Sequence, residues 1–191
     1  MNAKMSKSIK ILFPFIIAFL VFFVIKNWDP IASNNSEETK NFSNDYFSVD
    51  YPRTWKLSKE GNNISIINSK SISGYKENVV VQIQESNFGK APEADKLSDA
   101  LVKNMSSYDD PYMSDFKMIT SKIVTHQNYE SAKVIAKFTA RKANLDIISY
   151  YLLVPVGRNV FTLSYATPYS DSDNSNSDVL FEELLRTFEI K

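Results

Sequence analysis

Apolar and polar side chains alternate along several short stretches of this chain, and the first such stretch begins abruptly at Tyr46. Phe47, Val49 and Tyr51 are separated by single polar residues, and Pro52 then ends the run. A period of two is typical of a β-strand that buries one face, and proline cannot donate to the hydrogen-bond ladder of a sheet. Seven further stretches have strand character, namely residues 55–57, 64–67, 79–83, 119–123, 132–140, 145–156 and 161–165.

Two other stretches have a helical period instead. A helix is predicted after Pro92, which suits a first helical turn. Its apolar face comprises Ala94, Leu97, Leu101 and Met105. A second helix is predicted over residues 177–190, with Ser177 or Asp178 as its N-cap. Its apolar stripe comprises Leu180 or Phe181, Leu184, Leu185 and Phe188. Helices therefore interrupt runs of four strands, which predicts an α+β fold with an antiparallel sheet covered by helices.

Residues 11–25 form an uninterrupted apolar run, "ILFPFIIAFLVFFVI", between Lys10 and Lys26. Such a run, preceded by lysines, predicts that residues 1–30 are an N-terminal membrane anchor or a signal segment. The sequence "PIAS" at 30–33 is a poor cleavage site, which favours the uncleaved anchor. Either reading holds the N-terminus in the cytoplasm and places the following residues on the far side of the membrane. The domain is then membrane-anchored and extracytoplasmic, or secreted if the segment is cleaved.

Residues 31–44, "IASNNSEETKNFSN", contain few apolar side chains. A segment of this composition buries too little surface to order itself, so we expect a flexible linker. The globular domain is accordingly predicted to span residues 45–191.

The composition excludes several classes of function. The chain has no cysteine, which rules out disulfides, thiol catalysis and attachment through a lipidated N-terminal cysteine. Its 22 basic and 22 acidic residues balance overall. The leader is basic, so the remainder is mildly acidic, whereas a nucleic-acid-binding domain requires a basic stripe. We therefore expect no nucleic-acid partner.

Candidate catalytic and metal-binding residues are few. His126 is the only histidine, and no G-x-S-x-G motif accompanies it, so a surface histidine at a strand end is the preferred reading. Asp171, Asp173, Ser175 and Glu182 occupy positions 1, 3, 5 and 12 of a possible calcium loop. Asn176 replaces the turn glycine of that motif, and a strand precedes it instead of a helix. A solvated loop before a helix is therefore favoured over a calcium site, and we expect no catalytic, cofactor or metal site.

A loop with recognition character is predicted at residues 106–115. Its candidate contact residues for a ligand or partner are Tyr108, Asp109, Asp110, Tyr112 and Asp115. Adjacent aspartates in a loop normally point apart into water, which disfavours acid–base catalysis by this loop. Exposed tyrosine and methionine among polar neighbours suit recognition of another molecule.

The stretch "FSVDYPRTW", residues 47–55, resembles the beginning of the PsbP-like superfamily, which includes PsbP and DcrB-like extracytoplasmic proteins. The stretches "ENVVVQIQE" at 77–85 and "NVFTLSYATP" at 159–168, and the closing "LLRTFEI", are similar as well. The resemblance covers roughly residues 45–190. It implies an α/β/α sandwich around a central antiparallel sheet, and binding or scaffolding instead of catalysis. It carries over no photosystem residue, and we predict no photosynthetic role.

These observations favour a non-enzymatic, membrane-tethered, extracytoplasmic module that contacts the membrane through residues 11–25 and binds an envelope protein. The alternative is an envelope enzyme or small-ligand-binding protein whose site is formed by Asp and Tyr residues of loops. A third possibility, the receptor part of a sensor, is disfavoured because only about ten residues lie on the cytoplasmic side.

Overall fold

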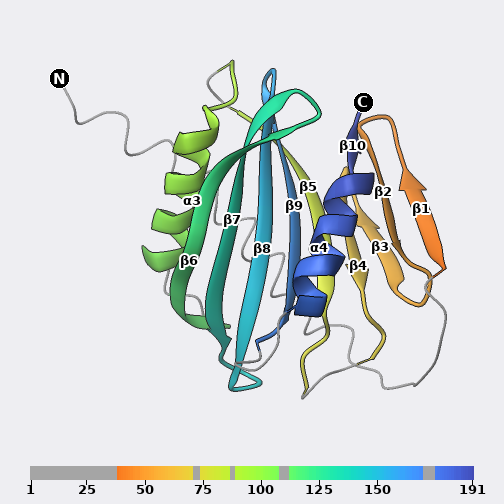
Figure 1. Cartoon of the computed structure of the whole chain (residues 1–191), viewed down its shortest axis with the longest axis vertical. Coiled ribbons are helices and arrows are strands. Elements are labelled where there is room, and N and C mark those ends of the chain that lie inside the picture. The colour runs from red at the N-terminus through yellow and green to blue at the C-terminus, as the bar shows by residue number, and fades with distance from the viewer. Residues whose placement is uncertain (1–37, 71–73, 87–88, 108–111, 170–174) are drawn as a thin grey trace.

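The computed structural model describes residues 38–70, 74–86, 89–107, 112–169 and 175–191. The strands are β1 (Thr39–Ser43), β2 (Phe47–Pro52), β3 (Lys56–Glu60), β4 (Asn63–Ile67), β5 (Asn78–Glu85), β6 (Met113–His126), β7 (Tyr129–Ala140), β8 (Leu145–Val156), β9 (Asn159–Pro168) and β10 (Glu189–Ile190), and the helices are α3 (Ala94–Ser107) and α4 (Ser175–Thr187). Seven strands form one antiparallel sheet in the order β3-β4-β5-β9-β8-β7-β6, and β1, β2 and β10 form a second sheet (Figure 1).

Tight turns set the register of the long strands. Gln127 and Asn128 join β6 to β7 and both have positive φ, 48° and 69°, as a type I′ turn requires. Gly157 joins β8 to β9 with a φ of 61°, a conformation that glycine adopts without a steric penalty. Because each turn has only two residues, neighbouring strands must run antiparallel, as the sequence predicted.

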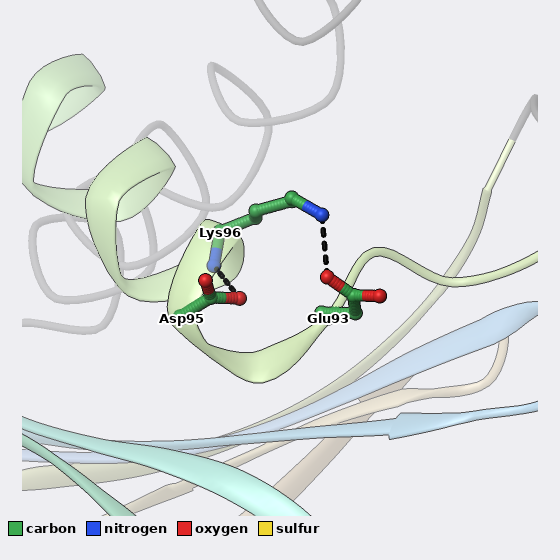
Figure 2. A network of polar contacts seen from close by, with 3 residues as sticks. All are labelled: Glu93, Asp95 and Lys96. Carbon is green, nitrogen blue, oxygen red and sulfur yellow. Dashed lines mark hydrogen bonds and ion pairs between the residues drawn. The ribbon is translucent and has the colours of Figure 1, made fainter.

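The helix α3 packs on one face of the seven-stranded sheet, near its β6 edge, and we call this the α3 face (Figure 1). The four residues of its predicted apolar face are all buried, and they pack with β7 and β8 residues such as Val134 and Leu153. At the start of the helix, the carboxylate of Asp95 accepts the N–H of Lys96 at 2.8 Å, and the Lys96 ammonium pairs with Glu93 (Figure 2). Acidic side chains in the first turn suit the helix dipole.

The opposite face, which we call the α4 face, is covered jointly by α4 and the three-stranded sheet. Phe181, Leu184 and Phe188 are buried there, as the predicted apolar stripe required. The ring of Phe188 lies 5.9 Å from that of Phe47 in β2. The α+β class is thus confirmed. The arrangement is dominated by its sheets and is only loosely an α/β/α sandwich, because a small sheet shares one face with the helix.

The structure corrects three boundaries. Residues 39–43, predicted to belong to a flexible linker, form β1 and pair with β2; the linker prediction is wrong for this stretch. The strand β6 begins at Met113, inside the loop predicted over 106–115. The second helix ends at Thr187, and Glu189–Ile190 form β10 instead of continuing it. The strand β10 is held by β2, which is distant in the sequence, whereas β1 and β6 each pair with the strand that follows directly. Local composition reveals none of these three pairings.

No helix in the described part of the chain has the length and apolar character needed to cross a membrane. The predicted membrane segment, residues 11–25, and the first part of the predicted linker lie outside the described residues.

Candidate functional site

The strand β6 forms one edge of the seven-stranded sheet. It is 14 residues long and pairs with β7. A strand at a sheet edge presents backbone N–H and C=O groups to which a further strand can bind. In Figure 1 this edge lies beside α3, on the opposite side of the molecule from β1. A long edge strand is a ready contact surface for another chain.

Exposed large apolar side chains concentrate on this strand. The described residues include five of them, and three belong to β6: Met118, Ile119 and Ile123, with exposed fractions of 47%, 54% and 45%. Single exposed apolar side chains are normal on protein surfaces, whereas a contiguous group marks a site of interaction. These three lie within six residues of one strand.

Lysine side chains form two like-charge pairs across β6 and β7 on the α4 face. Lys117 lies opposite Lys137, and Lys122 lies opposite Lys133. Like charges directly opposite each other destabilise a sheet. The β7 members are compensated, since Lys137 pairs with Asp146 at 2.8 Å and Lys133 pairs with Glu182.

The β6 members of these pairs are exposed, and neither Lys117 nor Lys122 forms an ion pair within the described residues. Lys117 also contributes to the positive field that lowers the pKa of Asp146, and both exposed lysines face solvent, where an acidic partner can reach them. We call Lys117, Met118, Ile119, Lys122 and Ile123 together the edge surface.

The ladder between β6 and β7 is irregular at two points. The register shifts between Ser114 and Lys117 and again between Met118 and Thr120. The second shift leaves Ile119 without a residue opposite it, and this is the most exposed of the three apolar side chains. Bulges and lysines are common devices that prevent indiscriminate pairing of sheet edges. The bulges and lysines of the edge surface therefore disfavour pairing with strands of arbitrary sequence.

The predicted contact loop overlaps this edge strand, because its residues 113–115 belong to β6. Tyr108, Asp109 and Asp110 lie outside the described residues. The ammonium group of Lys142 lies 4.9 Å from the centroid of the Tyr112 ring. Asp115 has a φ of 56° in the first bulge, and its carboxylate accepts a hydrogen bond of 2.9 Å from Ser114. Tyr112 and Asp115 therefore flank the start of β6, but they engage different neighbours.

The possible calcium loop has four residues, and two of them, Asp171 and Asp173, lie outside the described part of the chain. Ser175 begins α4, and Glu182 lies in the same helix, where it forms the ion pair with Lys133. The described residues contain no cluster of three or more potential metal ligands.

His126 ends β6 and contacts the C-terminal segment. Its Nε2 lies 3.0 Å from the carbonyl oxygen of Phe188, and the two rings stack with centroids 5.7 Å apart. Burial lowers the pKa of His126, and the hydrogen bond to Phe188 partly opposes that shift. The predicted position at a strand end is correct, and the side chain is half-buried, with a structural role in holding the C-terminus.

A polar cluster that the sequence analysis did not find lies at one end of β5 and β9. One oxygen of Glu77 accepts hydrogen bonds from Tyr165, at 2.8 Å, and from Thr167, at 2.7 Å. Its other oxygen accepts one from Asn68 at 2.7 Å. Tyr165 stacks on Tyr150 with ring centroids 5.8 Å apart. Glu77 directly precedes a buried strand, and only the fold brings its three hydrogen-bond donors together.

This cluster has the chemistry of a structural network. Burial is the main cause that raises the pKa of both Tyr165 and Tyr150, and the nearby carboxylates of Glu77 and Asp178 raise them further. Both hydroxyls are therefore held in their protonated form at neutral pH. The Glu77 carboxylate is already occupied by three donors, so the alternative of an Asp/Tyr active site gains no support from this cluster.

The comparisons with known proteins concern the fold. No protein-family profile matches the chain, and no curated protein matches it either. The solution structure of cyanobacterial PsbP from Synechocystis sp. PCC 6803 is similar, with a TM-score of 0.60 and 10% identity, over 87% of this chain and 99% of that one. LpqN of Mycobacterium tuberculosis, described as involved in cell envelope biogenesis, is similar with a TM-score of 0.54 and 9% identity, over 81% of this chain and 91% of that one.

A protein from Bacteroides thetaiotaomicron matches with a TM-score of 0.48 and 18% identity, over 76% of this chain, and the chain spans only 45% of its length. Likeness at identities this low establishes the fold alone. The PsbP-like fold that the sequence motifs indicated is confirmed by the match to cyanobacterial PsbP.

Proposed function

We propose that this chain is a non-catalytic, membrane-tethered, extracytoplasmic binding module that holds an envelope protein at the edge surface of β6. The observation that carries the proposal is the concentration of exposed apolar side chains on a long edge strand. The apolar leader and its lysines supply the tether and the orientation. The description of LpqN as a protein of cell envelope biogenesis is in keeping with this compartment.

The partner that suits this edge is an extended segment that adds as a strand next to β6. In such complexes main-chain hydrogen bonds give affinity, and alternate side chains give specificity. Apolar residues of the segment would pack on Met118, Ile119 and Ile123, and acidic residues would meet Lys117 and Lys122. The proposed partner segment is therefore both apolar and acidic.

Site-specific photo-crosslinking in intact cells tests the proposal. A photoreactive residue at position 119 is expected to capture one discrete protein. The same residue at Val179, an exposed apolar position of α4, serves as the matched control and should not capture it. Ile119→Glu is expected to weaken the captured complex about tenfold. The reason is that loss of a central apolar contact costs about 1–2 kcal/mol of binding free energy. Equal capture from positions 119 and 179 would contradict the edge as the contact site.

A further inference from the structure

The two faces of β6 present different side chains. Met118 lies opposite Ala136 and Ile123 lies opposite Ala132, and both alanines belong to the core that α3 covers. Residues directly opposite each other in an antiparallel pair point to the same face of the sheet. Met118 and Ile123 therefore point to the α3 face, and their exposed fractions there are 47% and 45%.

The other face of β6 is basic. Lys117 and Lys122 lie opposite two β7 lysines that alternate with those alanines, so all four lysines point to the α4 face. Carboxylates of β8 and α4 pair with the two lysines of β7. Within the described residues, no carboxylate lies at ion-pair distance from Lys117 or Lys122. The α4 side of this edge therefore carries an excess of positive charge.

The two faces repeat with the same spacing. The register shift between Met118 and Thr120 leaves Ile119 without a residue opposite it, so Ile119 adds no step to the ladder. Counted along β7, the two apolar side chains lie four positions apart, from 136 to 132, and the two lysines also lie four apart, from 137 to 133. Four strand positions span about 13 Å. A strand paired with β6 therefore meets one apolar side chain and one lysine, and then the same two types again.

A second copy of this chain does not compensate the charge of the edge. Residues 116–126 contain both lysines and no carboxylate. Pairing two copies of β6 along these residues would therefore bring four lysines to one junction, and like charges across a strand pair are destabilising. The occupant that fits the edge is a different segment, with acidic side chains where β6 has lysines.

We infer that the partner segment carries the pattern apolar–acidic–any–any–apolar–acidic, in an antiparallel strand next to β6. The inference rests on the proposed function and names the sequence of its partner. The apolar residues lie opposite Ile123 and Met118, and the acidic residues lie opposite Lys122 and Lys117. The antiparallel direction follows from the sheet, since its pairings among the described strands are all antiparallel and this pairing is the more stable one.

Three synthetic peptides test the pattern against the full chain in a zwitterionic detergent. The peptide GTVETTVETG carries it. The peptide GTETVVTETG has the same composition but one valine and one glutamate on each face of the strand. The peptide GTVKTTVKTG reverses the charge. Fluorescence anisotropy of labelled peptides is expected to show that the first binds at least about tenfold more tightly than the other two.

Hydrogen exchange locates the bound peptide. GTVETTVETG should slow amide exchange within residues 117–123, because its backbone pairs with the free edge, and should leave residues 56–60 on the opposite edge of the same sheet unchanged. Protection of residues 117–123 before any peptide is added would indicate a dimer through β6 and would overturn the inference. So would protection that appears only elsewhere.

A charge-reversed edge gives a result that an unfolded variant cannot mimic. The double variant Lys117→Glu with Lys122→Glu is expected to bind GTVKTTVKTG about tenfold more tightly than GTVETTVETG. Lys40→Glu with Lys56→Glu is the matched control, because it changes the net charge equally at exposed positions of β1 and β3. It should keep the original preference. An unchanged preference in the edge variant would overturn the inference.

Failure of the pattern is distinguishable from failure of the proposed function. Capture of one protein from position 119 in cells, combined with equal binding of the three peptides, would overturn the pattern and leave the function standing. Selective binding of GTVETTVETG without capture in cells would support the pattern and contradict the envelope function.

Discussion

Glu77 shows how one side chain can secure a junction between distant strands. Its carboxylate accepts hydrogen bonds from Asn68, Tyr165 and Thr167, which belong to two separate parts of the chain. Removing donors from water costs free energy, and hydrogen bonds to a charged acceptor offset that cost more strongly than neutral ones do. The network therefore stabilises the end of the sheet.

Replacing Glu77 by alanine is expected to lower the free energy of unfolding by about 2–4 kcal/mol. The change removes three charge-assisted hydrogen bonds and takes away the carboxylate that accepts from the buried hydroxyl of Tyr165. Urea denaturation followed by tryptophan fluorescence measures the loss. Glu85→Ala is the control, because Glu85 pairs with Arg158 at the surface, and exposed pairs contribute little. A loss for Glu77→Ala as small as that for Glu85→Ala would contradict the structural role.

His126 makes the stability of the C-terminal contact depend on pH. Burial lowers its pKa in the folded protein, so the neutral imidazole is the form that the fold favours. As the pH falls below about 6.5, the ordinary pKa of histidine, the unfolded chain takes up this proton before the folded one does, and stability decreases. His126→Gln is expected to reduce the fall in Tm between pH 7.5 and 5.5. An unchanged pH profile in that variant would contradict the assignment.

At the scale of elements, prediction from sequence succeeded where burial was strictly periodic. All four predicted core residues of α3 are buried, and β8 is buried on both faces, as its apolar run indicated. It failed for β1, because "TKNFS" buries only Phe42 and leaves the rest exposed. A strand with one core residue has no detectable period. The strand β1 forms because all five of its residues pair with residues of β2.

The strand β1 should therefore be part of the stable domain. A fragment that begins at residue 45, the boundary predicted from sequence, is expected to be less stable than one that begins at residue 38 by about 3 kcal/mol. The loss follows from the burial of Phe42, whose ring lies 5.5 Å from that of Phe47. Thermal unfolding of the two fragments measures it. In the longer fragment, Phe42→Ala should reproduce the loss and Lys40→Ala, at an exposed position of the same strand, should not.

Sequence could lead to the candidate site only in part. Residues 106–115 were predicted as a contact loop from their aromatic and polar character, and the last three of them belong to β6. The exposed residues of β6 were read only as a weakly alternating strand, since sequence does not show which strand lies at an edge. The grouping of buried polar side chains around Val80 was invisible for a related reason. Ser65, Val80 and Ser164 become neighbours only through the pairing of three strands.

At the scale of the whole molecule, the proposed function requires that the leader deliver this domain across a membrane. Residues 11–25 are apolar and follow three lysines, which favours a cytoplasmic N-terminus. The C-terminus ends in the exposed Lys191 after β10, and Figure 1 places it at the surface, so a reporter can be fused there without disturbing the core.

Reporter fusions at Lys191 test the orientation directly. Alkaline phosphatase folds only outside the cytoplasm because it needs disulfides, so its fusion should be active. The same fusion lacking residues 1–30 should be inactive and should leave the membrane fraction. An uncleaved anchor predicts that the full-length protein stays with the membranes after an alkaline wash, because an inserted apolar helix is not removed by changes of charge. Phosphatase activity from the leaderless fusion, or none from the full-length one, would contradict export and with it the proposed role in the envelope.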